Sequence, residues 1–222
     1  MNVLIVVAHP DDEVLGAGAT IPKLVESGHR VAVCTLVSSA AARSNLSDQL
    51  DLEQAEVFRR LGIEKSYCGD FPNIKTNATP QLLMVQFIES AIENWKAEAI
   101  YTHHPSDLNI DHRTTSSACQ AAARLFQRKP GLPPLRRLIF MEVPSSTDWS
   151  FDPAGVFTPN LFVEIGREGV EEKLKLLKIY SNVMREYPHP RSDAAITGLA
   201  AYRGAQAGCH YAEAFQLAFE RE

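Results

Sequence analysis

The motif A-H-P-D-D-E at residues 8–13 constrains this chain more than any other stretch of its sequence. It follows an apolar run over residues 3–7, which predicts a buried strand. A histidine and three acids at the end of a buried strand are costly unless a positive charge lies among them. The proline lacks a backbone donor, so the chain must leave the sheet here. A divalent metal ion accounts for the cluster, with His9 and Asp12 as ligands and Asp11 left free to move protons.

The rest of the chain alternates between strand and helix patterns. The predicted strands are residues 3–8, 31–37, 66–68, 99–102, 135–143 and 161–165, with 209–219 strand-like in part, and the predicted helices are 16–27, 48–61, 81–95, 112–126, 169–185 and 194–207. This alternation predicts an α/β fold with a doubly wound, mostly parallel sheet and helices on both faces. We expect residues 1–222 to form a single domain with one full hydrophobic core.

Charge and cysteine usage narrow the class of protein. Lys and Arg total 22 against 27 Asp and Glu, a formal net charge of −5, and no basic patch suited to nucleic acid is visible. The four cysteines match no zinc knuckle or redox pair, which favours a reducing compartment. We find no signal-peptide pattern and no apolar run long enough to cross a bilayer. We therefore expect a soluble cytoplasmic protein with no membrane span. The sequence does not fix its oligomeric state, and a homo-oligomer is possible.

A second polar cluster, at residues 103–112, also follows a predicted strand. The carboxyl ends of parallel strands line the crevice where ligands bind, so the two clusters should meet in one cleft. His112 would then join His9 and Asp12. Two imidazoles, one carboxylate and an open position are typical of catalytic zinc, although iron or another divalent ion is compatible with the same ligands.

These motifs resemble the LmbE/PIG-L family of zinc-dependent N-deacetylases. The first family motif stands unchanged at residues 8–13, the second ends in Asp111-His112, and a weaker third match lies within residues 203–215. The resemblance implies a Rossmann-like fold and hydrolysis of an N-acyl group, usually an acetyl group on an amino sugar. It implies Asp11 as the general base. The metal ligands that it implies are His9, Asp12 and His112.

One position departs from the family pattern. Some members carry a second histidine three residues before the last ligand, proposed to stabilise the oxyanion, and this chain has Asn109 there. An asparagine amide can donate a hydrogen bond but cannot shuttle a proton. We therefore expect Asn109 to be an oxyanion donor, and the acid role to fall to Asp11 once protonated or to His210. For His210, packing beside Tyr211 is the alternative.

Substrate contacts are expected from the loops that follow the other strands. Arg43 follows the second predicted strand, and Asp70 and Asn73 follow the third, so these side chains should reach the rim of the cleft. Arg203 lies in the third matching segment. For Arg43, Asp70 and Arg203, a surface or ion-pair role is the alternative.

The sequence thus predicts a zinc-dependent hydrolase that removes an N-acetyl or other N-acyl group from a small-molecule amino sugar or glycoconjugate. One alternative is a deacylase of a thiol–sugar conjugate of the mycothiol or bacillithiol type. Another is an inactive sugar-binding module of the same fold, which the unliganded acid Asp11 disfavours. Nicotinamide binding is also disfavoured, because the glycines at 16 and 18 are followed by Ile21 where a dinucleotide fingerprint needs a third glycine.

Overall fold

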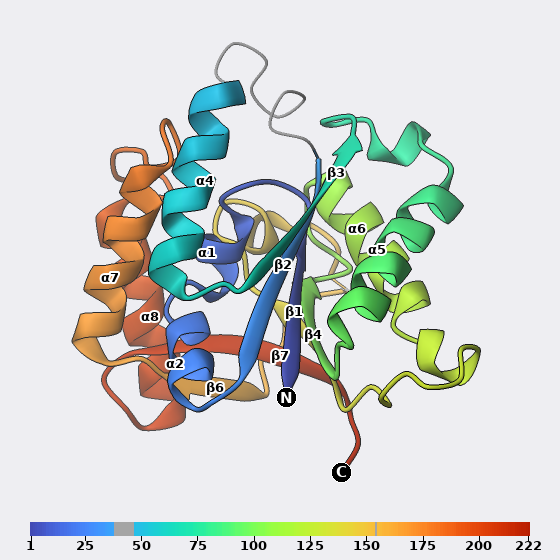
Figure 1. Cartoon of the computed structure of the whole chain (residues 1–222). Coiled ribbons are helices and arrows are strands. Elements are labelled where there is room, and N and C mark those ends of the chain that lie inside the picture. The colour runs from blue at the N-terminus through green and yellow to red at the C-terminus, as the bar shows by residue number, and fades with distance from the viewer. Residues whose placement is uncertain (38–46, 154) are drawn as a thin grey trace.

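The computed structural model describes residues 1–37, 47–153 and 155–222. Within them, seven strands form one sheet in the order β3-β2-β1-β4-β5-β7-β6 (Figure 1). Only β7 runs antiparallel to its neighbours, and the remaining pairs are parallel. The strands are β1 (Asn2–Val7), β2 (Arg30–Val37), β3 (Lys65–Phe71), β4 (Ala99–His103), β5 (Arg137–Met141), β6 (Leu161–Glu164) and β7 (Ala212–Glu220). The predicted fold class is confirmed.

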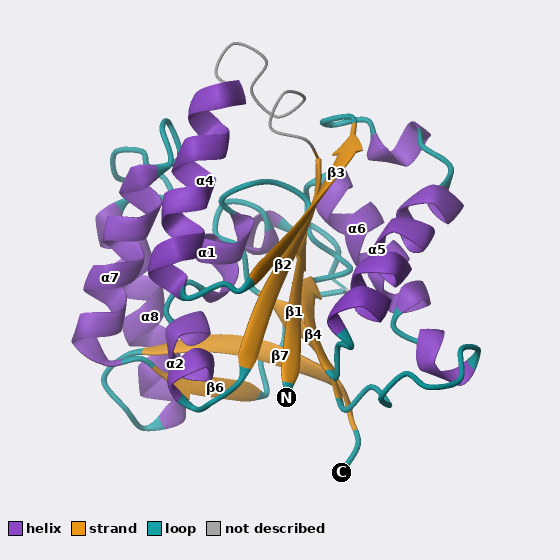
Figure 2. Ribbon diagram, viewed as in Figure 1, coloured by secondary structure: helices purple, strands orange, loops and turns teal. Residues whose placement is uncertain are grey.

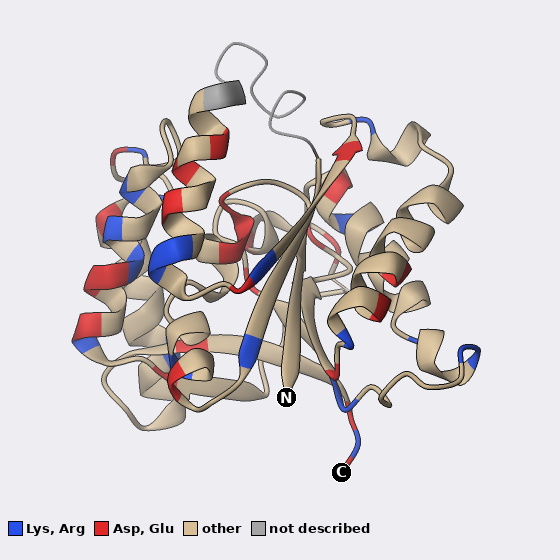
Figure 3. Ribbon diagram, in the orientation of Figure 1, with Lys and Arg blue, Asp and Glu red and all other residues tan. Residues whose placement is uncertain are grey.

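Helices cover both faces of the sheet, as Figure 2 shows. One face carries α1 (Asp12–Ala17), α2 (Thr20–Glu26), α4 (Ser47–Leu61), α7 (Gly166–Ile179) and α8 (Asp193–Ala207), and the other carries α5 (Gln81–Trp95) and α6 (Ile110–Ala122). Acidic side chains along α4 precede two arginines in its last turn, and α7 carries charges of both signs (Figure 3). No helix in the described ranges combines the length and the apolar character that a membrane crossing needs.

The central strand β1 explains why its sequence is a continuous apolar run. Successive side chains of a strand point to opposite faces, so Val3 and Ile5 enter the core under α1 and α7, while Leu4 and Val6 enter the core under α5 and α6. All four are buried. The stretch 3–7, buried on both faces, leaves no room for a polar side chain, so the polar motif at residues 8–13 begins only where the strand ends.

The prediction of one helix over residues 16–27 is wrong, because the chain forms α1 and α2 with a break between them. The break leaves backbone groups of both helices without helical hydrogen bonds, and the buried ion pair of Lys173 with Glu213 binds these groups. The carboxylate of Glu213 accepts from the backbone N–H groups of Ala19 and Thr20, and Lys173 Nζ donates to the carbonyl of Leu15 at 2.8 Å and to Glu213 at 2.6 Å. Helix termini expose such groups, and here two distant side chains satisfy them.

Among the other boundaries that differ from the prediction, two bear on the site. Helix α6 begins at Ile110 rather than at residue 112, because the side chain of Asn109 caps its first turn. Helix α7 ends at Ile179 rather than at residue 185, and a connection without regular structure follows it. The first change places His112 inside a helix. The second leaves Arg191, which borders the site, in the connection between α7 and α8.

Candidate metal centre

Two neighbouring parallel strands bring the polar clusters together. β1 pairs with β2 on one side and with β4 on the other, so the chain reverses its winding direction at β1. Open α/β sheets bind ligands at this position, outside the carboxyl ends of the strands. The turn after β1 carries His9 and Asp12, and the loop and first turn of α6 after β4 carry Asn109 and His112.

Three ligand atoms meet at this point: Nδ1 of His9, Oδ2 of Asp12 and Nε2 of His112. Each of the three distances among them is 3.3 Å. A tetrahedral ion with bonds of about 2.0–2.1 Å needs ligand atoms about 3.3–3.4 Å apart. The triangle therefore has the dimensions of one face of a tetrahedral site, and the residues predicted as ligands fit a metal of this type.

Each histidine of the triangle contacts a further carboxylate through its other ring nitrogen. Nε2 of His9 lies 3.0 Å from Oδ2 of Asp111, and Nδ1 of His112 lies 3.1 Å from Oδ2 of Asp107. Both carboxylates are buried. Such contacts orient a ligating imidazole and raise its basicity, and they leave the inward nitrogens for the ion.

Asp111 also connects the metal centre to the loop after β3. Its carboxylate accepts from the hydroxyl of Thr76 at 2.5 Å and from the backbone N–H of Ile74 at 2.6 Å. Ile74 has φ of 54°. A β-branched residue rarely adopts this left-handed conformation, so the bond to Asp111 holds a strained backbone in place. Ile74 and its neighbour Asn73, which the sequence suggested as a rim contact, both line the cleft.

The carboxylates of the cluster determine the protonation of the two histidine ligands. Burial lowers the pKa of His9, but its hydrogen bonds with Asp111 and Asp12 outweigh burial and raise that pKa to about 10. Burial acts on His112 in the same way, and Asp12 and Asp107 raise its pKa to about 9. Burial raises the pKa of Asp12, yet the neighbouring imidazoles hold it well below its usual value. Without a metal the inward nitrogens therefore hold protons, which an incoming cation must displace.

Two buried acids of the motif, Asp11 and Glu13, lie outside the triangle, and Asp11 is the one that lines the cleft. Asp11 is 5% exposed and occupies the N-cap position of α1 without a side-chain capping bond, and its φ of 108° is left-handed. Its backbone N–H donates to the buried carboxylate of Glu13 at 3.1 Å, which in turn accepts from the hydroxyl of Tyr180 at 2.6 Å. Burial raises the pKa of Glu13 to about 8. Strain of this kind persists where surrounding contacts enforce it, and it is concentrated at active sites.

These groups border one cleft with a volume of about 190 Å³. Its lining residues are His9, Pro10, Asp11, Asp12, Asn73, Ile74, Asn109, His112 and Arg191. Sequence reasoning missed Arg191, whose guanidinium Nη1 lies 3.6 Å from Oδ2 of Asp11. Its only signal in the sequence is a His-Pro-Arg run at 189–191, in a connection without hydrophobic periodicity.

The side-chain oxygen and the amide nitrogen of Asn109 have different surroundings. Its side-chain oxygen accepts from the backbone N–H of Asp111 at 2.9 Å. That bond fixes which end of the amide is the oxygen. The amide nitrogen has no hydrogen-bond partner in the described ranges, and the residue borders the cleft. The placement is compatible with the predicted donor role.

The histidines that precede this segment are held by structural contacts. Nε2 of His103 accepts from the backbone N–H of Ala8 at 2.8 Å, and its ring stacks on that of His112 with centroids 3.9 Å apart. Burial, with the neighbouring His112, lowers the pKa of His103 to about 3. His104 donates from Nε2 to the side-chain oxygen of Gln216 at 3.1 Å. The ring of His103 thus packs against a predicted metal ligand, and that of His104 packs beside Phe140 and Phe157.

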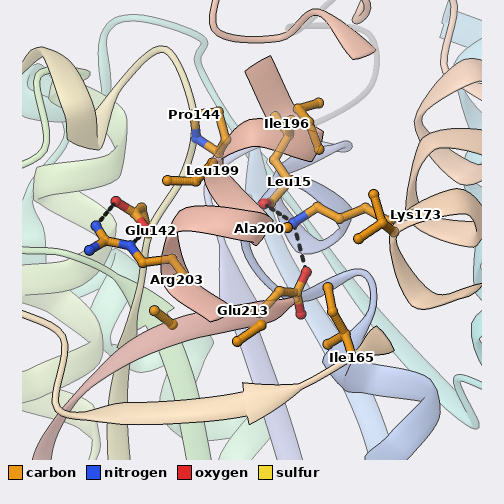
Figure 4. Close-up of a pocket in the computed structure, with 13 residues that line it drawn as sticks. Leu15, Glu142, Pro144, Ile165, Lys173, Ile196, Leu199, Ala200, Arg203 and Glu213 are labelled. Atoms are coloured by element: carbon orange, nitrogen blue, oxygen red, sulfur yellow. Dashed lines mark hydrogen bonds and ion pairs between the residues drawn. The ribbon is translucent and has the colours of Figure 1, made fainter. Parts of the chain in front are cut away.

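Of the other predicted residues, those that the structure describes do not line this cleft. Asp70 is exposed near the end of β3, and His210 is exposed between α8 and β7. Arg203 forms an ion pair with Glu142, with Nε 2.9 Å from Oε2, and it lines a separate pocket that also holds Lys173 and Glu213 (Figure 4). The structure thus shows the ion-pair alternative for Arg203. Arg43 lies outside the described residues.

Comparison with known proteins places the two motifs inside one family pattern. The family model PIG-L, described as GlcNAc-PI de-N-acetylase, matches residues 4–123. That range includes both residues 8–13 and residues 109–112. YaiS of Escherichia coli (strain K12), described as an uncharacterized deacetylase, is 26% identical over 183 residues, which cover 80% of this chain and 89% of that protein.

Two solved structures are similar in fold. The N,N'-diacetylchitobiose deacetylase from Pyrococcus horikoshii has a TM-score of 0.79 at 19% identity, over 97% of this chain and 83% of that chain. GalB, the 4-carboxy-2-hydroxymuconate hydratase from Pseudomonas putida KT2440, has a TM-score of 0.76 at 20% identity, over 100% of this chain and 98% of that chain. A deacetylase and a hydratase thus share the fold, which by itself does not select the reaction.

Proposed function

The chain belongs to the PIG-L family, described as GlcNAc-PI de-N-acetylase, and on that premise we propose that it is a zinc-dependent hydrolase that removes the N-acetyl group from an amino sugar or a sugar conjugate. The observation that carries the proposal is the triangle of His9 Nδ1, Asp12 Oδ2 and His112 Nε2, with sides of 3.3 Å. Three protein ligands with one open position are the arrangement of catalytic zinc, whereas structural zinc is usually closed by four.

The metal ion and Asp11 would carry out different parts of the reaction. Zinc bound by these ligands supplies Lewis acidity, which lowers the pKa of water from about 15.7 to about 7 and polarises a carbonyl. Asp11 lies in the same cleft and outside the ligand triangle, so its carboxylate can take the proton of the attacking water. The same carboxyl, once protonated, can return that proton to the departing amine.

Donors and contacts in the rest of the cleft would act on the substrate. The amide nitrogen of Asn109 can donate to the acyl oxygen as negative charge develops there. The acid step is assigned to Asp11 rather than to His210, because His210 is exposed and has no described contact with the cleft. Asp70 and Arg43 stay as proposed outer contacts for sugar hydroxyls, while the ion pair of Arg203 with Glu142 favours a structural role for Arg203.

The test is amine release from a panel of N-acetylated sugars, nucleotide sugars, glycoconjugates and thiol–sugar conjugates. We expect release from at least one member, loss of activity on addition of a chelator, and recovery on addition of zinc. Parallel recovery with Fe²⁺ identifies which metal serves best. Release from thiol–sugar conjugates alone would favour the first alternative, and sugar binding without release from any member would favour the inactive module.

A further inference from the structure

We propose that Arg191 is a further catalytic residue, whose guanidinium binds the acyl oxygen of the substrate and the carboxylate of the acetate product. The proposal rests on the proposed function. Arg191 belongs to the connection between α7 and α8, distant in sequence from both motifs, yet it lines the same cleft as His9, Asp12 and Asn109. It therefore reaches the space where the acyl group must lie.

The side chain of Arg191 is fixed before any substrate arrives. Its Nε donates to the hydroxyl of Ser145 at 2.6 Å, and its backbone N–H donates to Nδ1 of His189 at 3.0 Å. Its carbonyl accepts from the backbone N–H of Arg185 at 3.2 Å. The side chain is only 22% exposed. Groups held in this way lose little entropy when they bind a ligand.

The residue that holds Nε is itself in an unusual conformation. Ser145 follows β5 and has φ of 71°, in the left-handed region that non-glycine residues seldom adopt. Its hydroxyl thereby reaches the guanidinium. Backbone strain that serves to aim one side chain at another is a feature of functional sites more than of ordinary loops.

The positive charge of Arg191 suits it to bind an oxygen that becomes negative. It is the one lysine or arginine among the described residues that line the cleft, and its Nη1 lies 3.6 Å from the carboxylate of Asp11. Attack of water on an amide places negative charge on the acyl oxygen, and a fixed cation in a partly buried site stabilises that charge strongly.

The guanidinium of Arg191 also has N–H groups that no described residue binds. It carries five N–H groups, of which Nε uses one on Ser145 and Nη1 points one toward Asp11, 3.6 Å away. The others have no partner among the described residues, so they are available to a ligand. A planar fork of N–H groups matches the two oxygens of a carboxylate, which is the group that acetate presents.

The test compares Arg191→Ala and Arg191→Lys with Arg185→Ala, an exposed arginine of the same connection. Turnover, zinc content and the affinity of the zinc-loaded protein for acetate are measured for each. We expect Arg191→Ala to lower kcat about 100-fold, with KM changed less than about threefold and zinc content unchanged. Acetate affinity should fall at least about tenfold. Arg185→Ala should behave as wild type.

Chemical rescue separates a chemical role from a structural one. Guanidinium ion added at millimolar concentration should restore part of the turnover of Arg191→Ala and none of that of Asp11→Asn. Unchanged acetate affinity in Arg191→Ala, or a loss of turnover that guanidinium does not restore, would overturn the proposal. If the wild type releases amine from no substrate, the proposed function fails, while the acetate titration still decides whether Arg191 binds carboxyl oxygens.

Discussion

At the scale of single residues, the site depends on pairs in which a carboxylate fixes the orientation and raises the basicity of a histidine ligand. His112 presents Nε2 to the metal position because Asp107 contacts its Nδ1, and Asp107 is itself held by the hydroxyl of Thr147 at 3.0 Å. Carboxylates in this position raise ligand basicity and fix ring orientation. The metal affinity of this protein is therefore a property of the carboxylates behind the ligands as well as of the ligands.

Replacement of Asp107 with Asn should weaken zinc binding by about 10–100-fold, because the amide removes the negative charge beside His112. Competition with a chromophoric chelator measures the affinity directly. Asp70→Asn is the matched control, since Asp70 is exposed and apart from the triangle, and it should bind zinc as the wild type does. Equal affinities in the two variants would show that Asp107 does not tune the site.

Zinc affinity should rise with pH. The folded-state pKa values of His9, about 10, and His112, about 9, lie above neutral pH, so both rings hold protons in the metal-free protein. Binding displaces these protons, and between about pH 6 and 8 the apparent affinity should increase by up to about 100-fold per pH unit. The same chelator competition at several pH values measures the slope. A flat profile would mean that the rings are already neutral.

Asp11→Asn should lower kcat by about 10²–10⁴-fold, because an amide cannot accept the proton of water. Asparagine tolerates a left-handed backbone well, so the turn at φ 108° should survive the substitution. Zinc content, measured by atomic emission, should stay at one equivalent. Turnover within a few-fold of wild type would remove Asp11 from the role of base.

At the scale of elements, the break between α1 and α2 shows a helix boundary set by tertiary contacts. Lys173 of α7 and Glu213 of β7 supply the hydrogen bonds that a continuous helix would have made itself. Helix α1 carries Asp12 at its start, so this buried pair also holds the element that supplies a metal ligand. The pair is visible in Figure 4.

Glu213→Ala should destabilise the fold by about 3–5 kcal/mol, because it leaves a buried lysine charge without its partner. Urea unfolding of the metal-free protein measures the change in the free energy of unfolding. Arg167→Ala, which breaks the exposed pair with Glu171, is the control and should cost less than about 1 kcal/mol. A similar small cost in both variants would show that the buried pair is replaceable by water.

At the scale of the whole molecule, general rules of α/β folds account for most of what could be predicted. Residues 8–13 follow β1, and residues 104–112 follow β4. The rule that strand ends meet at a switch point predicted the contact between these two segments. Arg191 could not be found in this way, because it lies in a connection with no periodicity. It is placed by hydrogen bonds with the hydroxyl of Ser145 and with the backbone N–H of residue 185, which an alanine there would keep. The helix break was missed because Lys173 and Glu213 act from distant segments.

The central claim is that His9, Asp12 and His112 hold one catalytic cation. The most direct measurement is a zinc titration of the metal-free wild type and of His112→Ala, with bound zinc and amine release recorded at each point. For the wild type, both signals should rise together and level off at one equivalent, and the variant should show neither at the same zinc concentrations. Full zinc binding by His112→Ala, or a wild-type activity independent of zinc, would contradict the account.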